Sequence, residues 1–335
     1  MRIRALATAV VCLVALSASC SAPGDEATRG RDQVTVVALP FLSQMPLHIA
    51  AEEGFFAEQN LDVEFHMLGR NQDIMAVLAH GDVDVAAGLL TVNELSLASA
   101  GARLRVVASL TSSVEGACTS VAIIVRREHV ESGALTDPEQ IRRLRFDVNA
   151  LIPLGYAMDR YLNSFGLTID DVDAIEVPPP AALETLRQGD IDVTIDSEPF
   201  ISMHMATGEA AIWQAVEDVL PDYVHSVLMY GPTLIDERPD VGERFMTAVL
   251  KAIRQYRLGK TPRNLEIVER VTRLTPEQVS AACWPTPSHD ARVDPSAFLG
   301  YQQWSVSRGL LDRVLAAGEL FDLRFIDHAN AELSR

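Results

Sequence analysis

The sequence predicts an α/β protein built from two similar lobes. Residues 76–85 (AVLAHGDVDV) and 184–193 (ETLRQGDIDV) share the pattern Leu-x-x-Gly-Asp-(Val/Ile)-Asp-Val. The pattern is typical of a helix end, a glycine in the left-handed capping position, an acidic turn and a buried strand. Strands and helices alternate around both copies, which predicts two mixed, mostly parallel sheets facing a common cleft.

Composition excludes some classes of function. The chain has 335 residues, enough for two domains, and 48% of them are hydrophobic. The formal net charge of −18 argues against nucleic-acid binding, which needs basic patches. The sequence therefore indicates a globular α/β protein that acts on something other than DNA or RNA.

The N-terminus has the pattern of an export signal. Arg2 and Arg4 precede an apolar run over 6–16 that is too short to span a membrane as a mature helix. The next residues end at Cys20 and are similar to a bacterial lipobox, which predicts lipidation of Cys20; ordinary cleavage near Ser19 or Ala22 is the alternative. We expect a signal peptide at 1–19, a flexible tether at 20–32 and an exported protein anchored to the outer face of the bacterial cell membrane.

The first lobe is predicted over 33–126 and, after the chain returns, 228–335. Five strands are expected, at 33–39, 61–67, 83–87, 104–110 and 120–125, with helices at 47–53 and 71–79 and after residue 93. Ligands in such sheets lie beyond the carboxyl ends of the strands. The loops at 40–46, 88–93 and 111–119 should therefore form one binding rim.

The second lobe is predicted over 127–227. A capping box at 136–139 starts a helix, and short strands are expected at 145–148, 174–177 and 193–195. The loops at 149–155 and 196–200 follow strand ends and should face the first rim. Beyond this lobe we expect helices at 238–259 and 293–317, a short edge element at 321–326, and fraying at 329–335.

Cysteine usage leaves one even pair in the mature chain. Cys12 lies in the signal and Cys20 at its end, so Cys118 and Cys283 remain. An exported protein meets oxidising conditions, which makes a disulfide between them possible, although the sequence cannot show whether they approach closely enough.

The aspartates of the repeated unit invite a chemical interpretation. Asp82, Asp84, Asp190 and Asp192 directly follow glycines that end helices, so we interpret them as turn residues at the amino-end rim of each sheet. The histidines are scattered singly, and no catalytic triad order, phosphate loop or HExxH run occurs. The sequence predicts no metal, no cofactor and no enzymatic activity.

Three blocks resemble substrate-binding proteins of ABC importers, in the NMT1/THI5-like group that takes up nitrate, sulfonates, taurine or thiamine precursors. The blocks are 46–63 (PLHIAAEEGFFAEQNLDV), the two Gly-Asp-x-Asp units and 198–200 (EPF). The resemblance implies a type II periplasmic-binding-protein fold with two crossing strands, hinge closure on a ligand, and an ABC permease with its ATPase as partners.

Some relatives in this group are thiamine-pyrimidine synthases. The resemblance there requires a cysteine-rich motif and a lysine that carries a pyridoxal cofactor. This chain has no cysteine cluster, and Lys251 and Lys260 are its only lysines. An exported enzyme is therefore the less favoured alternative, as is a sensor or interaction module that has kept the fold.

The candidate ligand contacts lie in the loops beyond strand ends, with one aromatic residue that could stack on a ligand or belong to the core. They are Ser43, Gln44, Met45, Leu90, Thr91, Asn93, Asn149, Leu154, Gly155, Glu198 and Tyr230. The helix starts after Thr91 and Pro153 could offer N–H donors to an anion. Yet these loops contain no Arg or Lys, and Glu198 suits a ligand that donates hydrogen bonds or is positive. We expect a planar, mostly neutral solute such as a pyrimidine-like thiamine precursor; sulfonate, taurine or nitrate is the alternative.

Overall fold

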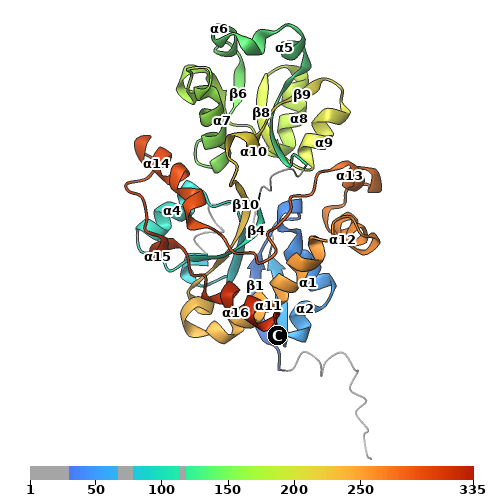
Figure 1. Cartoon of the computed structure of the whole chain (residues 1–335), viewed down its shortest axis with the longest axis vertical. Coiled ribbons are helices and arrows are strands. Elements are labelled where there is room, and N and C mark those ends of the chain that lie inside the picture. Colours follow the sequence, from blue (N-terminus) through green and yellow to red (C-terminus); the bar gives the residue numbers. More distant parts are fainter. Residues whose placement is uncertain (1–29, 67–77, 113–117) are drawn as a thin grey trace, which may run out of the picture.

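The computed structural model describes residues 30–66, 78–112 and 118–335. The predicted signal peptide, the lipidation site Cys20 and most of the helix expected at 71–79 lie outside the described residues. Figure 1 shows two bodies, one above the other, joined near the middle of the view.

The first sheet lies in the lower body of Figure 1 and has the order β2-β1-β3-β10-β4. Strand β10 is antiparallel to both neighbours, whereas β1, β2 and β3 are parallel. The strands are β1 (Asp32–Val37), β2 (Leu61–His66), β3 (Val85–Gly88), β4 (Arg105–Ser112) and β10 (Val224–Tyr230). The helices within and after them are α1 (Met45–Glu52), α2 (Phe55–Glu58), α4 (Val92–Ser99) and α11 (Pro239–Tyr256), with the one-turn elements η1 (Leu42–Gln44) and η4 (Thr233–Glu237).

The second sheet repeats this plan in the upper body, with the order β7-β6-β8-β5-β9. Here β5 is the antiparallel fourth strand. The strands are β5 (Val121–Arg126), β6 (Arg145–Asp147), β7 (Asp173–Ile175), β8 (Val193–Ser197) and β9 (Ala210–Ala215). The helices are α5 (Arg127–Glu131), α6 (Pro138–Ile141), α7 (Pro153–Asn163), α8 (Pro179–Gln188), α9 (Phe200–Ala206) and α10 (Val216–Val219), with η2 (Ala134–Thr136) and η3 (Ile169–Asp171).

Two crossing connections join the sheets. The chain leaves the first sheet after β4 and enters the second as β5; it leaves β9 through α10 and returns as β10. Strand β5 was expected in the first lobe, but its backbone pairs with β8 and β9, so it belongs to the second sheet. Strand β9 was not predicted, because its sequence AAIWQA lacks a clear apolar alternation.

The C-terminal segment departs from the expected helices. It contains α12 (Pro262–Thr272), α13 (Pro276–Ala281), η5 (Pro295–Phe298), α14 (Leu299–Ser307), α15 (Ala317–Leu320) and α16 (Arg324–Glu332). The single helix expected over 293–317 is wrong, because Gly309 adopts the left-handed conformation (φ 71°) just beyond α14. Fraying from Ala329 is also wrong, since Ala329 is buried against the core and α16 continues to Glu332.

The repeated unit has the same structural role in both lobes. Gly81 and Gly189 have φ of 82° and 78°, as the capping interpretation requires. The second aspartate of each unit then accepts a backbone N–H of the neighbouring parallel strand: Asp84 from Thr35 at 2.8 Å and Asp192 from Arg145 at 2.9 Å. Both bonds precede the strand pairing, so these carboxylates lie at the amino ends of the sheets.

Among the described residues, no helix combines the length and the apolar character that crossing a membrane requires.

Candidate functional site: the cavity between the lobes

A cavity of ≈ 250 Å³ lies between the two sheets. Its walls are formed by the carboxyl ends of β1 and β3 in the first lobe and of β6, β7 and β8 in the second, together with the returning strand. The lining residues include Val37, Leu39, Phe41, Ser43, Gln44, Ala87, Gly88, Leu89, Asp147, Asn149, Ile152, Leu154, Glu176, Val177, Pro178, Asp196, Ser197, Glu198, Phe200, Tyr223, His225 and Pro285. The site is therefore where parallel α/β sheets place their ligands.

The first-lobe wall is mostly apolar. Val37 ends β1, Leu39 follows that strand, and Leu89 follows β3. The buried amide of Gln44 is turned toward the backbone, where its Oε1 accepts the N–H of Leu39 at 2.7 Å. This wall offers a surface for the apolar body of a ligand.

The second-lobe wall carries carboxylates. Asp147 ends β6, and its two oxygens accept the N–H of Val177 at 2.8 Å and the hydroxyl of Thr194 at 2.9 Å. Asp196 on β8 accepts a hydrogen bond from His204 Nε2 at 2.9 Å. Glu176 follows β7 and is exposed.

Burial shifts the protonation of these groups. It raises the pKa of Asp147 to about 6, and the nearby charges of Asp196 and Glu176 raise it further. Burial also raises the pKa of Asp196, against the opposing effect of His204. The imidazole of His225 has its pKa lowered to about 3 by burial, so it is neutral at pH 7.

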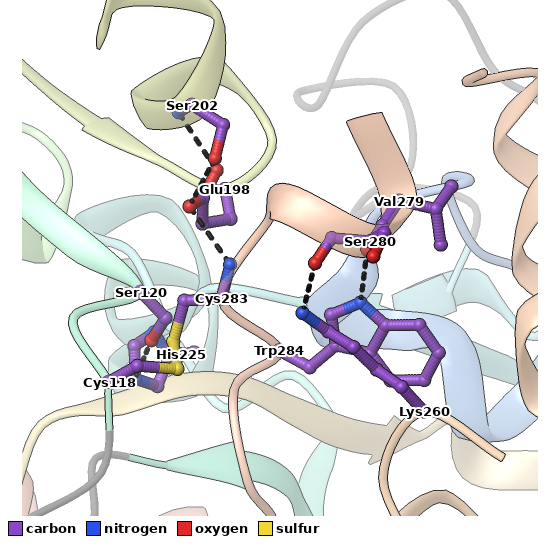
Figure 2. Close-up of a disulfide and its surroundings, with 10 residues drawn as sticks. All are labelled: Cys118, Ser120, Glu198, Ser202, His225, Lys260, Val279, Ser280, Cys283 and Trp284. Atoms are coloured by element: carbon purple, nitrogen blue, oxygen red, sulfur yellow. Dashed lines mark hydrogen bonds between the residues drawn. A yellow bond between two sulfur atoms is a disulfide. The ribbon is translucent and has the colours of Figure 1, made fainter. Parts of the chain in front are cut away.

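Glu198 joins the second lobe to the C-terminal segment (Figure 2). Its Oε2 accepts the backbone N–H of Ser202 at 3.0 Å, and its Oε1 accepts the Ser202 hydroxyl at 2.8 Å and the N–H of Cys283 at 3.0 Å. Cys283 in turn forms a disulfide with Cys118 in the first crossing connection, with a Cα–Cα distance of 5.7 Å. The predicted cysteine pair is thus bonded, and it stands directly beside a cavity-lining carboxylate.

The predicted contacts divide into two groups. Ser43, Gln44, Asn149, Leu154 and Glu198 line the cavity. The structure places the other six elsewhere, and three of these lie in the core of the first lobe: Met45, Leu90 and Tyr230.

Tyr230 was the candidate stacking residue, and its position leaves no face for a ligand. The ring is fully buried, and its hydroxyl donates to the carbonyl of Gly242 at 2.9 Å. Gly155 lies at the start of α7, where a Cβ would collide with the carbonyl oxygen of Asn149, so the residue permits close packing of the loop on the helix.

The helix start after Thr91 is already occupied by protein acceptors. Thr91 and Glu94 form a capping box, and the hydroxyl of Thr91 accepts the N–H of Asn93 at 3.2 Å. The N–H of Val92 donates across the lobes to the carbonyl of Leu151 at 3.0 Å. The donors that we expected for an anion therefore serve the protein itself.

Sequence reasoning missed the most distinctive lining residues, Asp147, Glu176 and Asp196. Each lies at or just beyond the end of a second-lobe strand, and that position is the signal that could have identified them. Both Asp147 and Glu176 fell inside expected strands, at 145–148 and 174–177, so they were not counted among the loop residues that could contact a ligand.

The lobes are in direct contact on the side of α14, so the cavity is closed there. Tyr301 donates its hydroxyl to Leu151 O at 2.7 Å, and Trp304 donates Nε1–H to Asp159 at 2.8 Å. Arg308 forms an ion pair with Asp170 at 2.5 Å. Figure 1 shows α14 to the lower left of α7 at this junction. In the described conformation the two lobes are therefore bonded to each other on this side of the cavity.

The sequence pattern of the NMT1-like family matches residues 27–271. The chain belongs to the NMT1-like family. A search of curated protein sequences finds no match to this chain.

Solved structures show the fold. A ligand-binding component of an ABC-type import system from Staphylococcus aureus, with zinc bound, superposes with a TM-score of 0.73 at 16% identity over 89% of this chain and 99% of its own. The alkanesulfonate-binding protein SsuA from Xanthomonas axonopodis pv. citri, bound to MOPS, gives 0.67 at 15% identity over 87% and 98%. This NMT1-like protein therefore has the type II periplasmic-binding-protein fold, as predicted.

The same fold also carries catalysis in another protein. The desulfurization enzyme DSZB gives a TM-score of 0.69 at 17% identity, over 90% of this chain and 100% of its own. Within 30–66, 78–112 and 118–335, no group of three His, Cys, Asp or Glu side chains is arranged to hold a metal ion.

Proposed function

We propose that this NMT1-like protein is an extracytoplasmic solute-binding protein of an ABC importer, which captures a small organic solute by closure of its two lobes. The observation that carries the proposal is the cavity of ≈ 250 Å³ at the carboxyl ends of both sheets, walled by both lobes. A volume at or just below the usual range for small-molecule sites suits a compact ligand.

Contacts across the cleft support the closure step. The hydrogen bond from Val92 to Leu151 and that from Trp304 to Asp159 join residues of different lobes, so separation of the lobes at these positions would break them. A ligand that touches both walls would favour this closed form over the open one by its difference in affinity. The closed form would then be the surface that the permease recognises.

The ligand that we propose is a flat nitrogen-containing solute such as a pyrimidine-like thiamine precursor. Carboxylate acceptors on one wall and apolar side chains on the other support it. Sulfonate, taurine or nitrate is the second candidate, since similar structures include an alkanesulfonate-binding protein. An exported enzyme, on a fold shared with DSZB, is a third and less favoured function.

Export with a lipid on Cys20 completes the proposal. A tether would keep the protein near its permease and raise its effective concentration there. A Cys20→Ala change removes the thiol that would carry the lipid, so it should abolish metabolic labelling of the protein by a fatty-acid analogue in the producing bacterium. Absence of label in the unchanged protein, or equal labelling of the variant, would refute the anchor and leave solute capture intact.

The direct test of capture is mass spectrometry of small molecules released from the purified protein, with a thermal-shift screen of thiamine precursors, sulfonates and nitrate. Binding of any one of them raises the melting temperature by mass action. A flat screen together with an empty protein would overturn the receptor function.

A further inference from the structure

We infer that the interlobe cavity takes a small organic cation, with an ammonium or amidinium group facing the second-lobe wall and an apolar body against the first. This inference rests on the proposed solute capture and names the charge class of the ligand.

The first step is the charge of the wall. Four carboxylates line the cavity: Asp147, Glu176, Asp196 and Glu198. Of the residues that the structure describes, none of those lining the cavity is Lys or Arg. A buried carboxylate is costly without a positive partner, and a cationic ligand would supply it.

The second step is the partners that these carboxylates already have. Asp147 is held by one backbone N–H and one hydroxyl, both neutral. Glu176 accepts a hydrogen bond from the Asn149 amide at 2.7 Å, and no other described residue donates to it. Asp196 is bonded to His204 Nε2 at 2.9 Å. Asp147 and Glu176 are therefore held by neutral donors, which leaves both carboxyl groups available to a cationic ligand.

The third step is the geometry of the sheet. Asp147, Glu176 and Asp196 come from β6 and its two neighbours in the order β7-β6-β8, so they form a contiguous acidic surface. Their charges are close enough to act on one another, because Asp196 and Glu176 both disfavour ionisation of Asp147. One amidinium can satisfy two such carboxylates with paired N–H donors.

The fourth step concerns the donors that an anion would need. The N–H of Val92 is bonded to Leu151 O at 3.0 Å, and the N–H of Gly155 to Ile152 O at 3.0 Å. At each helix start that could hold a sulfonate, at least one of these N–H donors is thus engaged within the protein. Donor occupancy and wall charge are independent observations, and both favour a cation over an anion.

The test uses three flat probes of nearly equal shape: benzamidine (cation), benzamide (neutral) and benzenesulfonate (anion). Calorimetry on the purified protein should show benzamidine binding at least about tenfold tighter than benzamide, as expected for charge-assisted hydrogen bonds, and no heat from benzenesulfonate.

Variants locate the effect. Asp147→Asn removes the charge while its amide can still accept from Val177 and donate to the Thr194 oxygen, so the fold should persist. Glu176→Gln changes an exposed residue and provides a second variant. Each should weaken benzamidine about tenfold and leave benzamide unchanged. Asp173→Asn, an exposed carboxylate at the other end of β7, is the matched control and should leave benzamidine binding as in the unchanged protein.

Each outcome has a separate meaning. Preference for benzamide or benzenesulfonate, or saturation by zinc chloride alone, overturns the cation inference and leaves solute capture standing. If Asp173→Asn weakens benzamidine binding as much as the other two variants do, Asp147 and Glu176 are not the residues that hold the cation. If no probe binds, the molecule released from the purified protein decides: a cation supports the inference, and an anionic or neutral molecule overturns it. No binding and no released molecule overturns capture itself.

Discussion

At the scale of single residues, Asp147 is a buried carboxyl group that also lines the cavity, and these two properties have opposite effects on its ionised form. Its side chain is only 9% exposed, which disfavours the carboxylate, yet the position beside the cavity makes that carboxylate available to a ligand. Buried groups with such shifted protonation cluster at functional sites.

The folded pKa of Asp147, about 6, exceeds the ordinary value of 3.8. The folded chain therefore binds more protons than the unfolded chain between about pH 4 and pH 6, and this carboxyl lowers stability as pH rises through that window. Asp147→Asn should accordingly raise the free energy of unfolding at about pH 8 and change it little at about pH 4. Urea unfolding of both proteins at the two pH values measures this difference, and an equal effect at both would contradict it.

Ligand binding should follow the same titration. Glu176, Asp196, Glu198, Tyr223 and His225 also line the cavity, and His225 is neutral throughout this range. Protonation of Asp147 removes one negative charge, so benzamidine affinity should fall as pH drops below about 6. Calorimetry from about pH 5 to pH 8 tests this, with Asp147→Asn as the control whose profile should be flatter. An unchanged wild-type affinity would exclude Asp147 from the contact.

Glu198 lines the cavity and also stabilises the fold through its hydrogen bonds. Its two oxygens accept three hydrogen bonds, so Glu198→Gln replaces one acceptor by a donor and leaves a buried N–H of Ser202 or Cys283 without its partner. The cost should be about 1–3 kcal/mol, measured by thermal or urea unfolding. Unfolding unchanged within error would show that these bonds contribute nothing.

At the scale of elements, the disulfide connects the first crossing connection to the segment after α13. The two cysteines are 165 residues apart in sequence, so the bond restricts a long loop of the unfolded chain. The double variant Cys118→Ser/Cys283→Ser should lose about 2–5 kcal/mol of stability in oxidising buffer. Wild type treated with a reductant is the control, and its free energy of unfolding should approach that of the variant. Equal urea midpoints for wild type and variant in oxidising buffer would refute the contribution of the disulfide.

At the scale of the whole molecule, the contacts of α14 with the second lobe predict that this helix acts as a clamp between the lobes without a ligand. Trp304→Phe removes the donor to Asp159, whose carboxylate is buried on α7. The ligand-free variant should therefore open more often and show a larger radius of gyration in small-angle scattering. Trp213→Phe is the matched control, because Trp213 packs on Tyr161 and Phe165 within the second lobe. Equal radii for all three proteins would exclude α14 as a clamp.

The sequence predicted the architecture well and the site only in part. Local signals such as Gly81, Gly189 and the strand patterns determine the elements, and repetition of one unit indicated the two lobes. Strand β5 was misplaced because its partners lie far along the chain, in β8 and β9.

Whether a residue reaches the cavity depends on long-range geometry more than the position of a helix or strand does. Loop position identified Asn149 and Glu198 but could not show that Leu90 turns into the core or that Thr91 caps its own helix. Asp147 is indistinguishable in sequence from any polar residue at a strand end. Only the approach of Val177 and Thr194 shows how it is held.

The two crossing connections described above also constrain the order in which the lobes can fold. All five strands of the second sheet lie between Val121 and Ala215, so they are complete before β10 has been synthesised. The first sheet, although it begins at Asp32, lacks an internal strand until Tyr230 has emerged. The N-terminal lobe should thus be the later one to mature, and oxidation of Cys118 must wait for Cys283. Truncation after about residue 220 should leave a protease-resistant second lobe beside an unformed first one.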